Sequence, residues 1–143
     1  DNIDTINAIQ TLINLYIEQG RYEDAEQYCS IIIESRERIQ GKEHPQTIID
    51  TCNLGWVQLE LGKPKGKKRF QYCLTQWTDP TDWKHHWAQL GSALSSVLIT
   101  KDFTASEKII QNYSKCFITS HKHRGEDVKE RPQQIKVKYF AII

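Results

Sequence analysis

The sequence of 143 residues predicts an all-α fold in which pairs of antiparallel helices repeat along the chain. Two observations predict this fold. Apolar residues recur at helical spacing, in segments that are closed by glycine or proline. Short motifs also return in the same order: LINLYIEQG at 12–20 is matched by LGWVQLELG at 54–62, and QYC occurs at 27–29 and again at 71–73. Matches about 42 residues apart are typical of repeats that contain one helical pair each.

The first helical pair is predicted from two apolar stripes separated by a turn. Gly20 ends the first helix, because glycine readily takes the left-handed conformation beyond a helix C-terminus. Acidic residues fill the first turn of the second helix and arginines lie near its end, as the helix dipole favours. The first stripe is Ile9, Leu12, Ile13, Tyr16 and Ile17, the second is Ala25, Tyr28, Cys29, Ile32 and Ile33, and the charged residues are Glu23, Asp24, Glu26, Arg36 and Arg38.

Two further helical pairs are predicted downstream. GKEHP at 41–45 interrupts the helical pattern, and Pro45 is expected to open the third helix. Because Gly62 aligns with Gly20, LGKPKGKKRF at 61–70 is predicted to be the turn inside the second pair, longer than the first turn by about two residues. The third pair is marked by Trp83, Trp87, Leu90, Leu94, Val97 and Leu98 in its first helix, and by Ile109, Ile110, Tyr113, Cys116 and Phe117 in its second.

The charge is distributed unevenly, although the formal net charge is only +1. Residues 1–60 hold four basic and eleven acidic side chains, whereas residues 61–143 hold fifteen basic and seven acidic ones. The densest basic run lacks the G-x-x-x-x-G-K-[ST] pattern of a phosphate loop. We interpret it as a solvated turn, with an electrostatic surface for nucleic acid as an alternative that no recognised nucleic-acid module supports. The run consists of Lys63, Lys65, Lys67, Lys68 and Arg69.

The segment TINAIQTLINLYIEQGRYEDAEQYCSIIIESRERIQGKEHPQT at 5–47 resembles a tetratricopeptide repeat of the long, kinesin-light-chain type. The match rests on Leu12, Tyr16, Gly20, Tyr22, Ala25, Gly41, His44 and Pro45. The small residue that the family places in the first helix is Ile13 in the first unit, but Gly55 and Gly91 in the next two. The resemblance implies a right-handed solenoid of antiparallel helix hairpins. Because the sequence begins at Asp1 without Met and ends on the apolar KYFAII, we expect it to be a fragment of a longer chain. Its units would be 4–45, 46–80 and 81–124, with 131–143 as the start of a fourth unit, a capping helix or a strand.

The resemblance also implies a function in protein–protein interaction without catalysis. First helices of such repeats line a concave groove for a peptide, a partner protein or another domain of the same chain. An intramolecular spacer and a helical nucleic-acid-binding domain using residues 61–143 are the alternatives. For Trp56, packing against a neighbouring helix is as good an interpretation as a groove contact. The groove residues expected from the family are Asn7, Gln10, Asn14, Asn53, Trp56, His85, Gln89 and Ser92.

Other kinds of site find little support in the sequence. Adjacent His85 and His86 point to different faces of a helix, and His121 and His123 fall in a polar loop, so we expect no metal. We also expect no catalytic constellation, cofactor, small-molecule substrate or membrane span. The four cysteines have no paired spacing and lie in apolar stripes, which favours buried, reduced thiols and a cytoplasmic location.

Overall fold

The computed structural model describes residues 2–102, 104, 107–112 and 115 of the chain. The described part is helical and contains no strand, so the all-α prediction is confirmed. The helices are α1 (Ile3–Glu18), α2 (Tyr22–Gln40), α3 (Pro45–Glu60), the 3₁₀ helix η1 (Pro64–Gly66), α4 (Lys67–Gln76) and α5 (Trp83–Thr100).

The helix ends follow the local signals in the sequence. The side chain of Asn2 caps α1 by accepting a hydrogen bond of 2.8 Å from the backbone N–H of Thr5. Gly20 follows Gln19, the C-cap residue of α1, and has a φ of 71°, as predicted for a helix-ending glycine. Pro45 is the first residue of α3, also as predicted. The preceding residue, His44, caps this helix with its ring Nδ1, which accepts from the backbone N–H of Gln46 at 3.2 Å.

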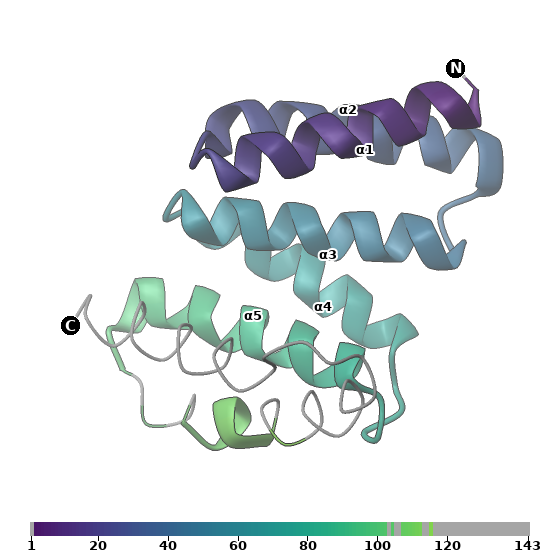
Figure 1. Cartoon of the computed structure of the whole chain (residues 1–143). Coiled ribbons are helices and arrows are strands. Elements are labelled where there is room, and N and C mark those ends of the chain that lie inside the picture. Colours follow the sequence, from purple (N-terminus) through teal and green to yellow (C-terminus); the bar gives the residue numbers. More distant parts are fainter. Residues whose placement is uncertain (1, 103, 105–106, 113–114, 116–143) are drawn as a thin grey trace.

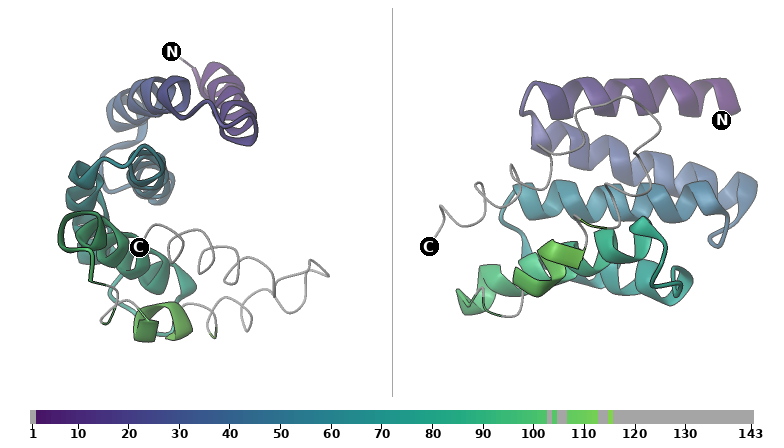
Figure 2. Two further views of the ribbon diagram at one scale, coloured as in Figure 1. Left: turned by 90° about the vertical axis from the view of Figure 1, so that its left-hand side faces the viewer. Right: turned by 60° about the horizontal axis from the view of Figure 1, so that its bottom comes forward.

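The helices stack as a solenoid of antiparallel hairpins. Figure 1 shows α1, α3 and α5 one below the other, with α2 and α4 behind them. In the left view of Figure 2 the stack forms an arc, with α2 and α4 on its outer side. Helix α2 packs against both α1 and α3, and α4 packs against both α3 and α5. The second helix of each hairpin therefore joins its own hairpin to the next one.

The second hairpin closes around one aromatic side chain. Phe70 of α4 is fully buried between Gly55 of α3 and Gly91 of α5. A Cβ atom at Gly55 would lie 3.0 Å from the Phe70 ring, and one at Gly91 would lie 2.3 Å from it. Any larger residue at position 91 would therefore have to displace Phe70. In the first hairpin the equivalent position is Ile13, which is itself buried in the core between α1 and α2.

Residues 61–66 form the predicted turn of the second hairpin, whereas residues 67–70, which we also expect in this turn from the sequence, begin α4. The chain leaves α3 through Gly62, whose φ is 70°, passes through η1 and enters α4. The first hairpin instead needs only residues 19–21 between its helices. The extra length is thus taken up by a short 3₁₀ helix that begins at Pro64.

Some of the other predictions concern described residues and can be checked, whereas the rest fall outside the described residues. Cys29, Cys52 and Cys73 are free and buried, as expected, and Cys116 lies outside the described residues. Residues 107–112 are helical, and Ile110 is buried in one cluster with Leu90 and Leu94 of α5. The rest of that helix, including Tyr113 and Phe117, and the segment 131–143 lie outside the described residues, and the proposed unit boundaries stay predictions.

Candidate functional site

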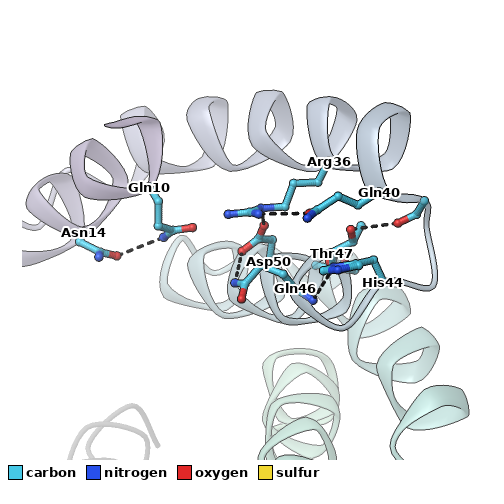
Figure 3. Close-up of polar contacts among 10 residues, drawn as sticks. Gln10, Asn14, Arg36, Gln40, His44, Gln46, Thr47 and Asp50 are labelled. Atoms are coloured by element: carbon cyan, nitrogen blue, oxygen red, sulfur yellow. Dashed lines mark hydrogen bonds and ion pairs between the residues drawn. The ribbon is translucent and has the colours of Figure 1, made fainter. Parts of the chain in front are cut away.

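The first candidate site is the inner face formed by α1, α3 and α5. On α1, Asn7 and Asn14 are exposed and Gln10 is half-buried. The Gln10 amide donates a hydrogen bond of 3.3 Å to Oδ1 of Asn14, so these two side chains lie together on the helix (Figure 3). Since each amide can both donate and accept, this row can pair with the backbone of an extended peptide.

On α3, the two predicted groove residues differ in how closely they pack against neighbouring side chains. Asn53 is half-buried at the surface. Trp56 is also half-buried, but its ring stacks on Trp87 of α5 at 6.2 Å between centroids and meets the edge of Phe70 at 5.4 Å. Its indole nitrogen is buried without a hydrogen-bond partner within the described part of the chain. Trp56 therefore contributes to the core between α3 and α5 as well as to the surface.

On α5, Gln89 and Ser92 are half-buried, and so is His85. His85 Nδ1 lies 2.6 Å from the carbonyl oxygen of Trp77, so it carries the hydrogen and donates. His86 Nε2 similarly lies 2.7 Å from the carbonyl oxygen of Pro80. The two histidines thus tie the loop 77–82 to the start of α5. Among the described residues no three His, Cys, Asp or Glu side chains gather in a way that could hold a metal ion, and His121 and His123 lie outside them.

A cluster of tryptophans lies beside these residues. Trp87 is its centre, with ring centroids 5.6 Å from Trp83, 6.1 Å from Trp77 and 6.2 Å from Trp56. Trp83, Trp87 and Trp56 all keep part of their surface accessible. Aromatic side chains of this size contribute large contact areas at interfaces, so the cluster gives the inner face an apolar part next to its amides.

The second candidate site is the basic run, and the structure explains part of its charge. Glu26 of α2, with a side chain only 15% exposed, pairs with Lys63 at 2.5 Å and with Lys65 at 3.4 Å. It also accepts from the Gln58 amide at 3.1 Å. Burial alone would raise the pKa of Glu26, but the hydrogen bonds from Lys63 and Gln58 outweigh it and lower this pKa. The sequence-based expectation that Glu26 fills the first turn of α2 is wrong, because the acids of that turn are Glu23 and Asp24. Glu26 instead binds the turn of the second hairpin.

Comparison with known families decides what kind of repeat this is. The family model of the tetratricopeptide repeat matches residues 4–65, which span α1, α2, α3 and the start of η1. This segment is a tetratricopeptide repeat. Such repeats generally serve as scaffolds for protein interaction. No curated protein and no solved structure matches the chain.

The repeat also contains a buried ion pair that the sequence analysis missed. Arg36 of α2 and Asp50 of α3 meet with 2.5 Å between Nε and Oδ2, and their side chains are 7% and 1% exposed (Figure 3). Gln46 donates to Asp50 at 3.2 Å, and Arg36 donates to Gln40 at 3.3 Å. A signal was present, because Arg36 continues the apolar stripe of α2 at four residues after Ile32. The sequence-based expectation that Arg36 acts through the helix dipole is wrong, because the basic residue in the last turn of α2 is Arg38.

None of the helices in the described residues is long and apolar enough to cross a bilayer.

Proposed function

We propose that the chain is a protein-interaction module that binds an extended peptide or a partner helix across the inner face of α1, α3 and α5. The observation that carries this proposal is the accessibility of the inner face. All eight residues expected in the groove keep accessible surface, whereas their sequence neighbours Ile6, Ile13, Leu54, Ala88 and Leu90 are buried. The apolar sides of the helices are buried between neighbouring helices of the solenoid, whereas the side that carries the amides stays accessible to a ligand.

The structure also separates the residues that can test the proposal from those that cannot. Replacing Trp56 would remove packing against Phe70 and Trp87, so a loss of binding would be confounded with a loss of stability. His85 is similarly engaged with the loop before α5. Asn7, Asn14 and Asn53 are the better choices, because their removal leaves the core intact.

The experiment selects peptides from a random display library against the wild-type chain and then compares two triple variants. One variant changes Asn7, Asn14 and Asn53 to alanine. The control changes three exposed amides of the outer helices, Gln27, Gln71 and Gln76, to alanine. We expect the inner-face variant to lose at least about tenfold in affinity for the selected peptides, which is roughly 1.4 kcal/mol, while the control stays within twofold. Equal losses in both variants, or loss only in the control, would contradict the inner face as the binding surface.

A further inference from the structure

A cleft on the outer side of the solenoid is separate from the inner face. It lies between α2 and α4, with α3 as its floor, and has a volume of about 460 Å³. This size falls within the range of about 300–1,000 Å³ that small-molecule sites occupy. Its charged lining residues are Lys42, Lys65, Lys68, Arg69 and Glu37. We propose that this cleft binds a small anion that carries two or more phosphate groups.

The charge of the cleft supports an anionic ligand. Among the described residues that line the cleft, four cations face one carboxylate, which gives a net charge of +3. Only one of the four is substantially compensated, since Lys65 lies 3.4 Å from Glu26. Lys42 has its ammonium 5.0 Å above the ring of Tyr72, and Lys68 is exposed without an ion-pair partner among the described residues. Phosphate monoesters carry about −1.5 to −2 each near neutral pH, so two of them match this charge.

The helix that supplies two of these cations makes the local potential more positive. Lys68 and Arg69 lie in the first turn of α4, which contains no acidic residue and has no side-chain cap. The positive end of the helix dipole is directed to the same place, and it disfavours cations there. Helix stability alone would therefore select against this arrangement, whereas an anion in the cleft would be attracted by the lysine, the arginine and the dipole together.

The cleft is also held in shape before any ligand arrives. Gln58 on its floor is 3% exposed, donates to Glu26 and accepts a hydrogen bond of 3.2 Å from Nε of Arg69. This contact orients the guanidinium through Nε and leaves its two terminal amino groups as the donors for a phosphate, which arginine binds in a two-point geometry. On the other side, the Tyr72 hydroxyl donates to the carbonyl oxygen of Lys42. Groups fixed in this way lose little freedom on binding.

A small anion fits these observations better than a nucleic acid does. A nucleic-acid strand is held by cations spread along its backbone. Here the cations converge from α4, η1 and the loop after α2 on one cleft. One face of Tyr72, the aromatic residue of the cleft, is covered by the Lys42 ammonium, so that face is not free for a base to stack on.

The test titrates the chain with inorganic pyrophosphate in a calorimeter, at two salt concentrations. We expect one site per chain, and binding at least tenfold weaker for Arg69→Gln and severalfold weaker for Lys68→Gln. Glu37→Gln should bind at least twofold more tightly, because it removes the one carboxylate of the cleft. The matched control is Lys67→Gln, which removes a charge from the same run but does not line the cleft, and it should stay within twofold.

Three results would overturn the proposal. The first is the absence of binding at millimolar pyrophosphate by a wild-type chain whose circular dichroism shows it to be folded. The second is an equal loss for Lys67→Gln and Lys68→Gln, which would reduce the effect to overall charge. The third is tight binding of a single-stranded RNA oligonucleotide that pyrophosphate does not displace, because this would assign the cations to nucleic acid.

Discussion

Two acid–base contacts join α2 to the second hairpin, one near the start of α3 and one in the turn that follows α3, and they differ mainly in their access to water. Near the end of α2, Arg36 and Asp50 have side chains that are 7% and 1% exposed. Near its start, Glu26 is 15% exposed and its partner Lys63 is 40% exposed. Since the helices are antiparallel, these contacts hold the first hairpin against both ends of the same helix of the second.

Because the two contacts differ in solvation, the pKa values of their acids are shifted in opposite directions. Burial raises the pKa of Asp50, and the hydrogen bond from Gln46 and the charge of Arg36 only partly offset it. At Glu26 the hydrogen bonds prevail over burial, so its pKa is lowered. A buried ion pair recovers its desolvation cost only through good geometry, whereas a partly solvated one has less to recover. Removing one partner of the buried pair, and leaving the other buried, should therefore destabilise the fold more than removing one partner of the solvated pair.

The largest effect is expected for Asp50→Ala. This change leaves the guanidinium of Arg36 buried without its carboxylate, and breaking a buried pair in this way costs about 3–5 kcal/mol. Urea unfolding followed by circular dichroism measures the loss. The double variant Arg36→Met with Asp50→Leu serves as the control and should recover most of the stability, because well-packed apolar residues can replace a buried pair. A double variant no better than Asp50→Ala would mean that the charges themselves stabilise this end of the interface.

A smaller effect is expected for Glu26→Gln at the other end. The amide keeps the shape of the side chain but loses the charge to which Lys63 and Gln58 donate, and hydrogen bonds to charged groups contribute about 1.5–3 kcal/mol. The same urea experiment measures it. Glu23→Gln is the matched control, since Glu23 is exposed on the same helix and its change should stay within about 0.5 kcal/mol. If the two variants lost equal amounts, Glu26 would act only through the helix dipole.

The pH dependence of the two contacts should have opposite signs. The pKa of Glu26 is lowered from 4.5, so its contribution is present above that pH and is lost as the pH falls through its folded-state pKa. The pKa of Asp50 is raised from 3.8, so its contribution is present below that pH and is lost as the pH rises through its folded-state pKa. Each unit of displacement corresponds to about 1.4 kcal/mol.

The measurement compares the free energy of unfolding of the wild type with that of Glu26→Gln and of Asp50→Asn between pH 3 and pH 6. As the pH falls, the free energy of unfolding of the wild type should approach that of Glu26→Gln. Relative to Asp50→Asn, the free energy of unfolding of the wild type should instead increase. Parallel curves for the two variants would show that both acids are in equivalent environments.

The sequence predicted the parts of this interface that depend on local signals. Helical spacing, Gly20, Pro45 and a long turn after Gly62 are determined within one or two turns of the chain, and the structure confirms them, although the turn ends at residue 66 and not at 70. The small residue at position 91 could be assigned by resemblance, but its partner Phe70 is supplied by another helix. The physical reason why position 91 needs a glycine, which is the close approach of Phe70, therefore requires the packed structure.

The polar contacts between hairpins could not be predicted in the same way. Arg36 and Asp50 are 14 positions apart, and Glu26 and Lys63 are 37 apart, so no local pattern links the partners. Before the start of α2 is known, the dipole argument gives no reason to separate Glu26 from its exposed neighbour Glu23, although in the structure Glu23 lies in the first turn of the helix and Glu26 lies beyond it. Only the packing of α2 on α3 decides which acid finds a cation. The same packing pairs Lys63 and Lys65 with Glu26, and of these two lysines Lys65 also lines the outer cleft, together with Lys68 and Arg69.

The smallest effect on stability is expected for Lys65→Gln. Lys65 is 61% exposed and lies 3.4 Å from Glu26, and exposed pairs of this kind contribute about 0.2–1 kcal/mol. We expect the lower end of this range, because Lys63 and Gln58 already hold the carboxylate. The matched variant Lys63→Gln should lose more stability in the same urea experiment, since its contact is shorter and less exposed. Pyrophosphate titration should give the reverse order, because Lys65 lines the outer cleft and Lys63 does not. If Lys63→Gln weakened both stability and pyrophosphate binding more than Lys65→Gln, the division of the basic run between structure and ligand would be wrong.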